Sequence, residues 1–224
     1  MIRLLYVSSL TFLFFASFFL NACSDPEMEK KVHFDKGVEY VQQQQFKEAI
    51  LEFRNAIQLD PAFAKARYRL GLVYIETGEL QKAFQELRKV AELDPSNFDA
   101  QLKIAEFLLL QNDLDQSRSY ADNILAHKPE YSEAWAVLGN IELTSGNIEE
   151  AEKAVNKAIA AQPDTDRYYV LQAKIYHEMQ RSNKVEQSLL KAIELNPESF
   201  STYQLLTTFY FSQNEEDKAR KQLL

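Results

Sequence analysis

The sequence predicts an all-α solenoid built from stacked helix-turn-helix units. Three observations carry this prediction: a fixed proline spacing, small residues in the same register as the prolines, and apolar residues between them. Five of the six prolines lie 34 residues apart, at Pro61, Pro95, Pro129, Pro163 and Pro197. A period of this length is typical of arrays in which each unit buries its apolar face against the next copy.

The small residues predict where the two helices of each unit cross and where the first helix ends. With repeat position 1 at Lys30, all five glycines of the chain fall at position 8 or position 15. Alanine replaces glycine at position 8 in two copies, so that position requires small size, as at a close helix crossing. Position 15 holds Gly78, Gly146, Asn112 and Asn214, the residue types that tolerate the left-handed conformation at a helix end.

The proline at position 32 ends the second helix, because the residue before a proline is pushed out of helical conformation. We therefore expect a first helix up to about position 14 and a second helix over positions 17–30. The predicted units are 30–63, 64–97, 98–131, 132–165 and 166–199, with a partial sixth unit at 200–224. The last unit has no closing proline, and this predicts a fragment of a longer array.

The repeat pattern resembles the tetratricopeptide repeat over nearly all of the chain after residue 30. Small residues recur at positions 8, 20 and 27, and bulkier apolar residues recur at position 24, as in Phe53 and Leu87. The resemblance implies a right-handed superhelix in which the first helices line a concave groove for a protein or peptide partner.

In that family, positions 2, 5, 6, 9, 12 and 13 face the groove. The resemblance therefore implies a partner-binding groove that includes Phe34, Val38, Tyr68, Arg69, Leu72, Leu102, Lys103, Asn140 and Lys174. The first three repeats combine apolar side chains with two cations, which suits a helix or extended peptide with apolar anchors and an acidic residue. The alternative is that neighbouring helices cover some of these residues and that the others only contact solvent. The chaperone-binding carboxylate clamp is disfavoured, since apolar residues stand at its positions.

The N-terminus has the pattern of an export signal. Residues 4–20 carry no charge and follow a single cation, Arg3. The run ends in Leu20-Asn21-Ala22-Cys23, which resembles the lipobox of bacterial lipoproteins. The resemblance implies a signal peptide at 1–22, lipidation of Cys23 and a tether at 23–29, and Ser24 favours the outer membrane over the inner one. An uncleaved membrane anchor is the alternative.

Composition and motifs disfavour other function classes. The net charge is −8 and the cations form no basic stripe, so nucleic acid is not an expected partner. The three histidines lack metal-ligand spacing, and every glycine belongs to the repeat. We therefore expect a non-enzyme with no catalytic residue, no metal, no cofactor and no evident small-molecule substrate.

These features predict a lipid-anchored adapter or scaffold that faces the periplasm of a Gram-negative bacterium. Three segments further resemble the start of the tetratricopeptide lipoprotein of the PEP-CTERM/exosortase system: ACSDPE, FDKGVEYV and FKEAILEFRNAIQLDP. This resemblance implies a role in exopolysaccharide production and surface-protein export. A type IV pilus-assembly lipoprotein is one alternative. Another is the targeting arm of a larger enzyme whose catalytic domain lies beyond Leu224.

Overall fold

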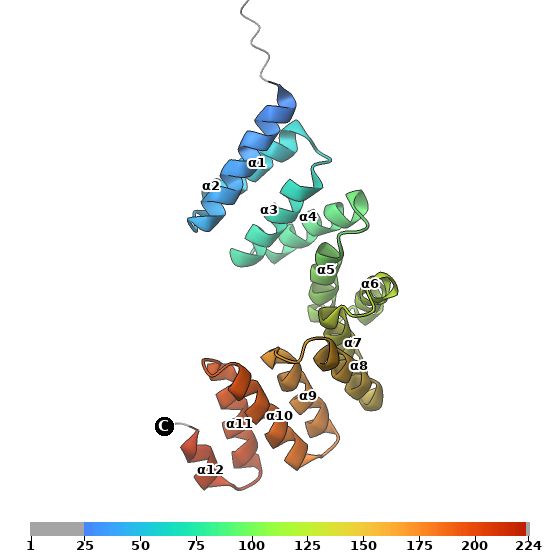
Figure 1. Cartoon of the computed structure of the whole chain (residues 1–224), viewed down its shortest axis with the longest axis vertical. Coiled ribbons are helices and arrows are strands. Elements are labelled where there is room, and N and C mark those ends of the chain that lie inside the picture. Colours follow the sequence, from blue (N-terminus) through green and yellow to red (C-terminus); the bar gives the residue numbers. More distant parts are fainter. Residues whose placement is uncertain (1–24, 223–224) are drawn as a thin grey trace, which may run out of the picture. The chain divides into compact units, whose positions relative to one another are not determined.

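The computed structural model describes residues 25–222, which form twelve α-helices and no strand (Figure 1). This confirms the all-α prediction. The helices are α1 (Pro26–Gln42), α2 (Phe46–Leu59), α3 (Ala64–Glu76), α4 (Leu80–Leu93), α5 (Phe98–Leu110), α6 (Leu114–His127), α7 (Ser132–Thr144), α8 (Ile148–Ala161), α9 (Asp166–Glu178), α10 (Ser182–Leu195), α11 (Phe200–Ser212) and α12 (Glu216–Lys221). The helices form two compact units: the N-terminal unit ends at Glu79 and the C-terminal unit begins at Leu80.

The turn at repeat position 15 has one backbone conformation in all six copies. Gly78 and Gly146 have φ of 77° and 78°, and Asn112 and Asn214 have φ of 61° and 60°. The other two copies place glutamine there, with φ of 58° at Gln44 and 56° at Gln180. The turn therefore imposes the left-handed conformation even on a residue that does not favour it.

The residue before each proline ends the second helix of a unit, as the sequence predicts. Asp60 has an extended backbone, with φ −138° and ψ 94°, and its N–H donates to the carbonyl of Ala56. Its carboxylate accepts a hydrogen bond from the backbone N–H of Ala62 at 3.0 Å. The other carboxylate oxygen accepts one from Lys30 Nζ at 2.8 Å, which connects the end of α2 to α1.

The first helix begins earlier than the sequence predicts. Residues 26–29, expected in the tether, form the first turn of α1. Asp25 caps this turn by accepting a hydrogen bond from Glu27 N, and Pro26 occupies a position where its missing N–H costs nothing. Acidic residues in the first turn are also favourable near the positive end of the helix dipole.

Close helix crossing explains the small residues at position 8. In the N-terminal unit, α1 packs on α2, and a Cβ added at Gly37 would lie 2.6 Å from Cε1 of the buried Phe53. In the C-terminal unit, a Cβ at Gly139 would lie 3.3 Å from Leu171 Cδ2. Position 8 therefore requires a small side chain, and the requirement is stricter at Gly37.

The C-terminal unit begins with α4, which packs on α5, and continues as antiparallel helix pairs with apolar interiors. The pairs are α5–α6, α7–α8, α9–α10 and α11–α12, and the first helices also contact one another from α5 to α7 and from α7 to α9. Buried side chains such as Ile104, Ile124 and Ile141 fill the space between the pairs. This packing places the first helices side by side along one face.

Two polar residues at positions usually filled by core residues find partners in neighbouring helices. Glu142, where other repeats have tyrosine or leucine, accepts hydrogen bonds from Arg118 Nη1 at 2.6 Å and Asn147 Nδ2 at 2.8 Å. The Arg118 guanidinium lowers the pKa of the Glu142 carboxyl, although burial opposes this. Gln172 similarly bonds to Asn156 and Ser188, on α8 and α10. These residues are therefore part of the packing between repeats.

Candidate functional site

The predicted groove residues of the N-terminal unit lie on its two first helices. Phe34 and Val38 are on α1, whereas Tyr68, Arg69 and Leu72 are on α3; we call these five residues the N-terminal face. The four apolar or aromatic side chains are half-buried and Arg69 is exposed. The Phe34 ring also packs within the unit, with its centroid 5.2 Å from that of Phe63 and 5.9 Å from that of Phe53.

Two predicted groove residues on α5 have other roles. Leu102 is only 5% exposed and belongs to a buried cluster with Ala105, so it contributes to packing and offers little surface to a partner. Lys103 is half-buried and forms an ion pair with Glu106 one turn later, at 2.7 Å. Their charges thus compensate each other on the helix surface.

Asn140 lines a hollow of about 370 Å³ between α5, α7 and α9, which we call the central hollow. Its walls include Leu110, which is 80% exposed, together with the charged side chains of Glu133 and Arg167. Those two charges lie 3.5 Å apart as an ion pair. The amide nitrogen of Asn140 donates one hydrogen bond to the carbonyl of Ala136, which leaves its second N–H and its amide oxygen for other partners.

Lys174 lines a larger hollow, of about 680 Å³, which we call the C-terminal hollow. Its floor is apolar and comes from buried residues of α9, α10 and α11, including Val185, Leu189 and Phe209. Its walls are Leu143 on α7, Val170 and Lys174 on α9, and Leu205, Thr208 and Ser212 on α11, with His177 and Glu178 at the edge. The hollow therefore combines an apolar base with a polar rim, as binding sites for apolar side chains do.

The sequence interpretation did not assign Leu205 or Phe209 to the groove. Leu205 stands at repeat position 6, which faces the groove in the family, so the repeat register could have predicted it. The register could not predict Val185 and Leu189, because they line the hollow from α10, the second helix of a unit.

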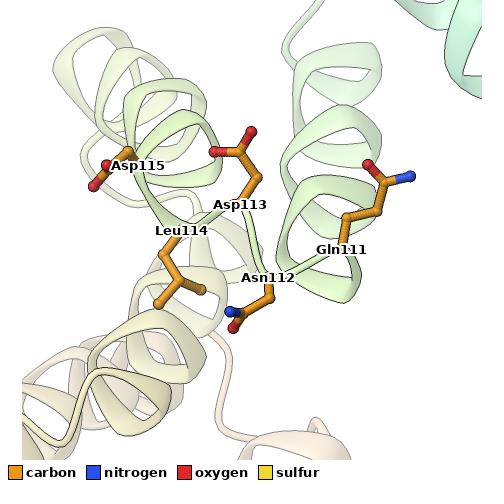
Figure 2. A pocket seen from close by; sticks show the side chains of 5 residues that line it. All are labelled: Gln111, Asn112, Asp113, Leu114 and Asp115. Carbon is orange, nitrogen blue, oxygen red and sulfur yellow. The ribbon is translucent and has the colours of Figure 1, made fainter.

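A third depression lies over the turn between α5 and α6 and carries no comparable chemistry. Figure 2 shows its five side chains, Gln111 to Asp115, projecting in different directions from consecutive residues. Asp113 serves as the N-cap of α6 and accepts a hydrogen bond from Gln116 N. Its carboxylate is therefore occupied by the helix end.

Residues 25–222 contain neither a cluster of metal-ligating side chains nor a helix suited to a bilayer. No group of histidine, cysteine or acidic side chains in this range has the geometry to hold a metal ion. Within the same residues, no helix has the length and hydropathy needed to span a bilayer. Cys23 and the signal-like segment lie outside the described residues.

Models of one repeat family match several segments of the chain. Models described as tetratricopeptide repeat match residues 64–97, 118–175 and 166–199, and one described as TPR repeat matches residues 37–78. Together they cover more than half of the chain. The chain belongs to the tetratricopeptide repeat family. Proteins with this fold generally serve as scaffolds for protein interactions, which agrees with apolar hollows along the first helices.

Several solved structures share the fold at low sequence identity. PilW, described as a widely conserved type IV pilus biogenesis factor, has a TM-score of 0.76 at 18% identity, over 86% of this chain and 90% of that one. PilF of Pseudomonas aeruginosa has a TM-score of 0.71 at 18% identity, over 88% and 90%. A tetratricopeptide repeat protein from Parabacteroides merdae has 0.72 at 17%, over 87% and 77%. Comparison with curated protein sequences finds no significant match.

Proposed function

We propose that this protein is a lipid-anchored adapter of the bacterial envelope that binds protein partners without catalysing a reaction. The observation that carries the proposal is the series of apolar surfaces on the first helices: the N-terminal face, the central hollow and the C-terminal hollow. Exposed apolar surface that is hollowed and rimmed by polar groups marks binding sites for other macromolecules.

Membrane attachment through Cys23 is the second part of the proposal and rests on the lipobox resemblance. Residues 1–22 would be removed, and the lipid on Cys23 would hold the array at the periplasmic face of the outer membrane. Two or three acyl chains, at about 0.8 kcal/mol per buried methylene, anchor a protein stably where one chain does not. The first helix would then begin three residues after the anchor, at Pro26, with Asp25 as its N-cap.

A palmitate analogue tests the anchor directly. The wild-type protein should incorporate the label and sediment with membranes. Cys23→Ala should lose the label and accumulate as unprocessed precursor, because the sulfur that receives the lipid is absent. Equal labelling of both proteins would remove the lipoprotein proposal.

For the pathway, we propose exopolysaccharide production or PEP-CTERM surface-protein export, because three N-terminal segments resemble the lipoprotein of that system. Assembly of type IV pili is the second candidate, favoured by the similarity of fold to PilW and PilF. Affinity purification from detergent-solubilised envelopes separates the two, since they predict export components in one case and pilus components in the other.

The same purification tests the N-terminal face. Replacing Tyr68 and Leu72 together by alanine should reduce partner capture while the circular dichroism signal of the helices stays unchanged. Leu51→Ala is the matched control, because Leu51 is 58% exposed on α2 and lies outside this face. Unchanged capture by the Tyr68/Leu72 variant would show that partners bind elsewhere on the array.

A further inference from the structure

The first repeat leaves one face of α1 uncovered. Repeat position 3 is buried in every later repeat, as at Ala66, Tyr168 and Thr202. In the first repeat this position holds Val32, which is 45% exposed. Met28 lies one turn before it on the same helix face and is 66% exposed. We call these two neighbouring side chains at the start of α1 the apolar pair.

The same face of α1 becomes charged farther along the helix. Lys36 and Glu39 are exposed at repeat positions 7 and 10, where most later repeats bury apolar residues such as Leu70 and Val73. A polar outer face is what the end of a repeat array requires. Burial of these two charges beneath another repeat would be costly. A further repeat stacked on α1 therefore does not explain the apolar pair.

The place of the apolar pair in the chain indicates what covers it. Met28 lies five residues after Cys23, and α1 begins at Pro26. Three residues of extended chain reach roughly 10 Å, so a lipid on Cys23 would hold the first turn of α1 at the bilayer surface. Apolar side chains of a helix at that surface are stabilised by burial at the boundary between headgroups and acyl chains.

We infer that the apolar pair inserts into the interfacial region of the lipid bilayer, so that the first two turns of α1 form a second membrane contact beside the acyl chains. Exposed charges of both signs flank the pair and balance: Lys31, Lys36, Glu29 and Asp35. The contact therefore depends on apolar burial and not on attraction to anionic headgroups. It restricts how α1 tilts about its anchor. This inference rests on the lipid anchor proposed above and names a protein surface that the anchor brings to the lipid.

Site-specific labelling tests the contact on the processed, lipidated protein in vesicles of phosphatidylethanolamine and phosphatidylglycerol. Cys23 is the only cysteine of the chain, so once its sulfur carries the lipid, an introduced cysteine is the single free thiol. That thiol is labelled with the fluorophore NBD, whose emission strengthens and shifts to shorter wavelength in an apolar environment. Met28→Cys and Val32→Cys should both show this shift on transfer into vesicles, and lipids with brominated acyl chains should quench both labels.

Two control positions carry the same label. Glu39→Cys lies on the same face of α1 but about 16 Å farther along the helix than Met28, and Leu51→Cys replaces an exposed leucine on α2. Neither label should shift or be quenched. Adding Val32→Asp to the Met28→Cys protein should reduce the shift and the quenching at position 28, because a carboxylate resists leaving water. Adding Leu51→Asp instead should change neither.

Mass spectrometry of the peptide that contains Cys23 separates this inference from the anchor. If Cys23 carries its lipid and the labels at positions 28 and 32 behave like the two controls, the inference is wrong and the anchor stands. A shift without quenching by brominated lipids would mean that protein, such as a second copy of the chain, covers the apolar pair, and this also overturns the inference. If Cys23 carries no lipid, the anchor and the inference fail together.

Discussion

The turn at repeat position 15 gives opposite predictions for two substitutions at equivalent sites. Gln180 holds φ of 56° and Gly146 holds φ of 78°, each at the turn between the two helices of its unit. Gln180→Gly should stabilise the protein, whereas Gly146→Ala should destabilise it. The left-handed conformation is the same in both turns, and only the presence of a Cβ differs.

The magnitude follows from the backbone alone. A Cβ added at Gly146 would meet no atom within 4 Å, so no steric contact enters the comparison. A left-handed conformation costs an L-residue roughly 1–2 kcal/mol, and the larger backbone entropy of unfolded glycine offsets roughly 0.5–1 kcal/mol of it. We therefore expect a gain of about 0.5–1 kcal/mol for Gln180→Gly and a loss of about 1 kcal/mol for Gly146→Ala.

Urea unfolding followed by circular dichroism measures both effects. The midpoint should rise for Gln180→Gly and fall for Gly146→Ala, with the slope of the transition unchanged, because the surface exposed on unfolding is the same. Gln213→Gly, immediately before the turn that contains Asn214, is a control. Gln213 has φ of −90°, so glycine should bring no gain there. If Gln180→Gly and Gln213→Gly shift the midpoint equally, the left-handed conformation does not explain the effect.

Three further predictions concern packing. Gly37→Ala should cost about 1–3 kcal/mol in a urea titration because of the 2.6 Å contact, whereas Gly139→Ala should be nearly neutral, since alanine's helix propensity compensates a milder contact. Arg118→Met should lower the free energy of unfolding by about 1–3 kcal/mol at pH 7, because Glu142 loses its main partner. Since Arg118 lowers the pKa of Glu142 in the folded state, the difference in stability from wild type should shrink as the pH falls through this pKa. A difference that does not change with pH would contradict this origin. Thr207→Ala should raise the unfolding midpoint, because the buried Thr207 hydroxyl has no hydrogen-bond partner among residues 25–222, and a lowered midpoint would contradict this reasoning.

The repeat architecture could be predicted from the sequence because it depends on local rules. The residue before Pro61 leaves the helix through a clash between neighbouring residues, and Gly78 ends a helix through the freedom of its own backbone. The predicted second helix over positions 17–30 matches α4 at Leu80–Leu93, for example. The all-α fold and the family therefore follow from interactions between residues that are close together in the chain.

Local rules also failed in identifiable places. Gln44 and Gln180 adopt the left-handed conformation that their residue type does not suggest, because the helices packed on either side of the turn outweigh a cost of about 1–2 kcal/mol. Residues 26–29 join α1 because Asp25 caps them, although their composition suggested a tether. In both cases a neighbouring interaction decided between conformations that are close in energy.

The sequence by itself determined the period, the helix ends and the close crossings at position 8. The tertiary structure alone decided which groove positions are accessible: Leu102 is buried, whereas Leu205 lines a hollow whose floor comes partly from α10. It also brought Arg118 to Glu142, 24 residues away. The physical reason is that helix ends depend on backbone geometry within a few residues, whereas exposure depends on side chains that several helices bring together.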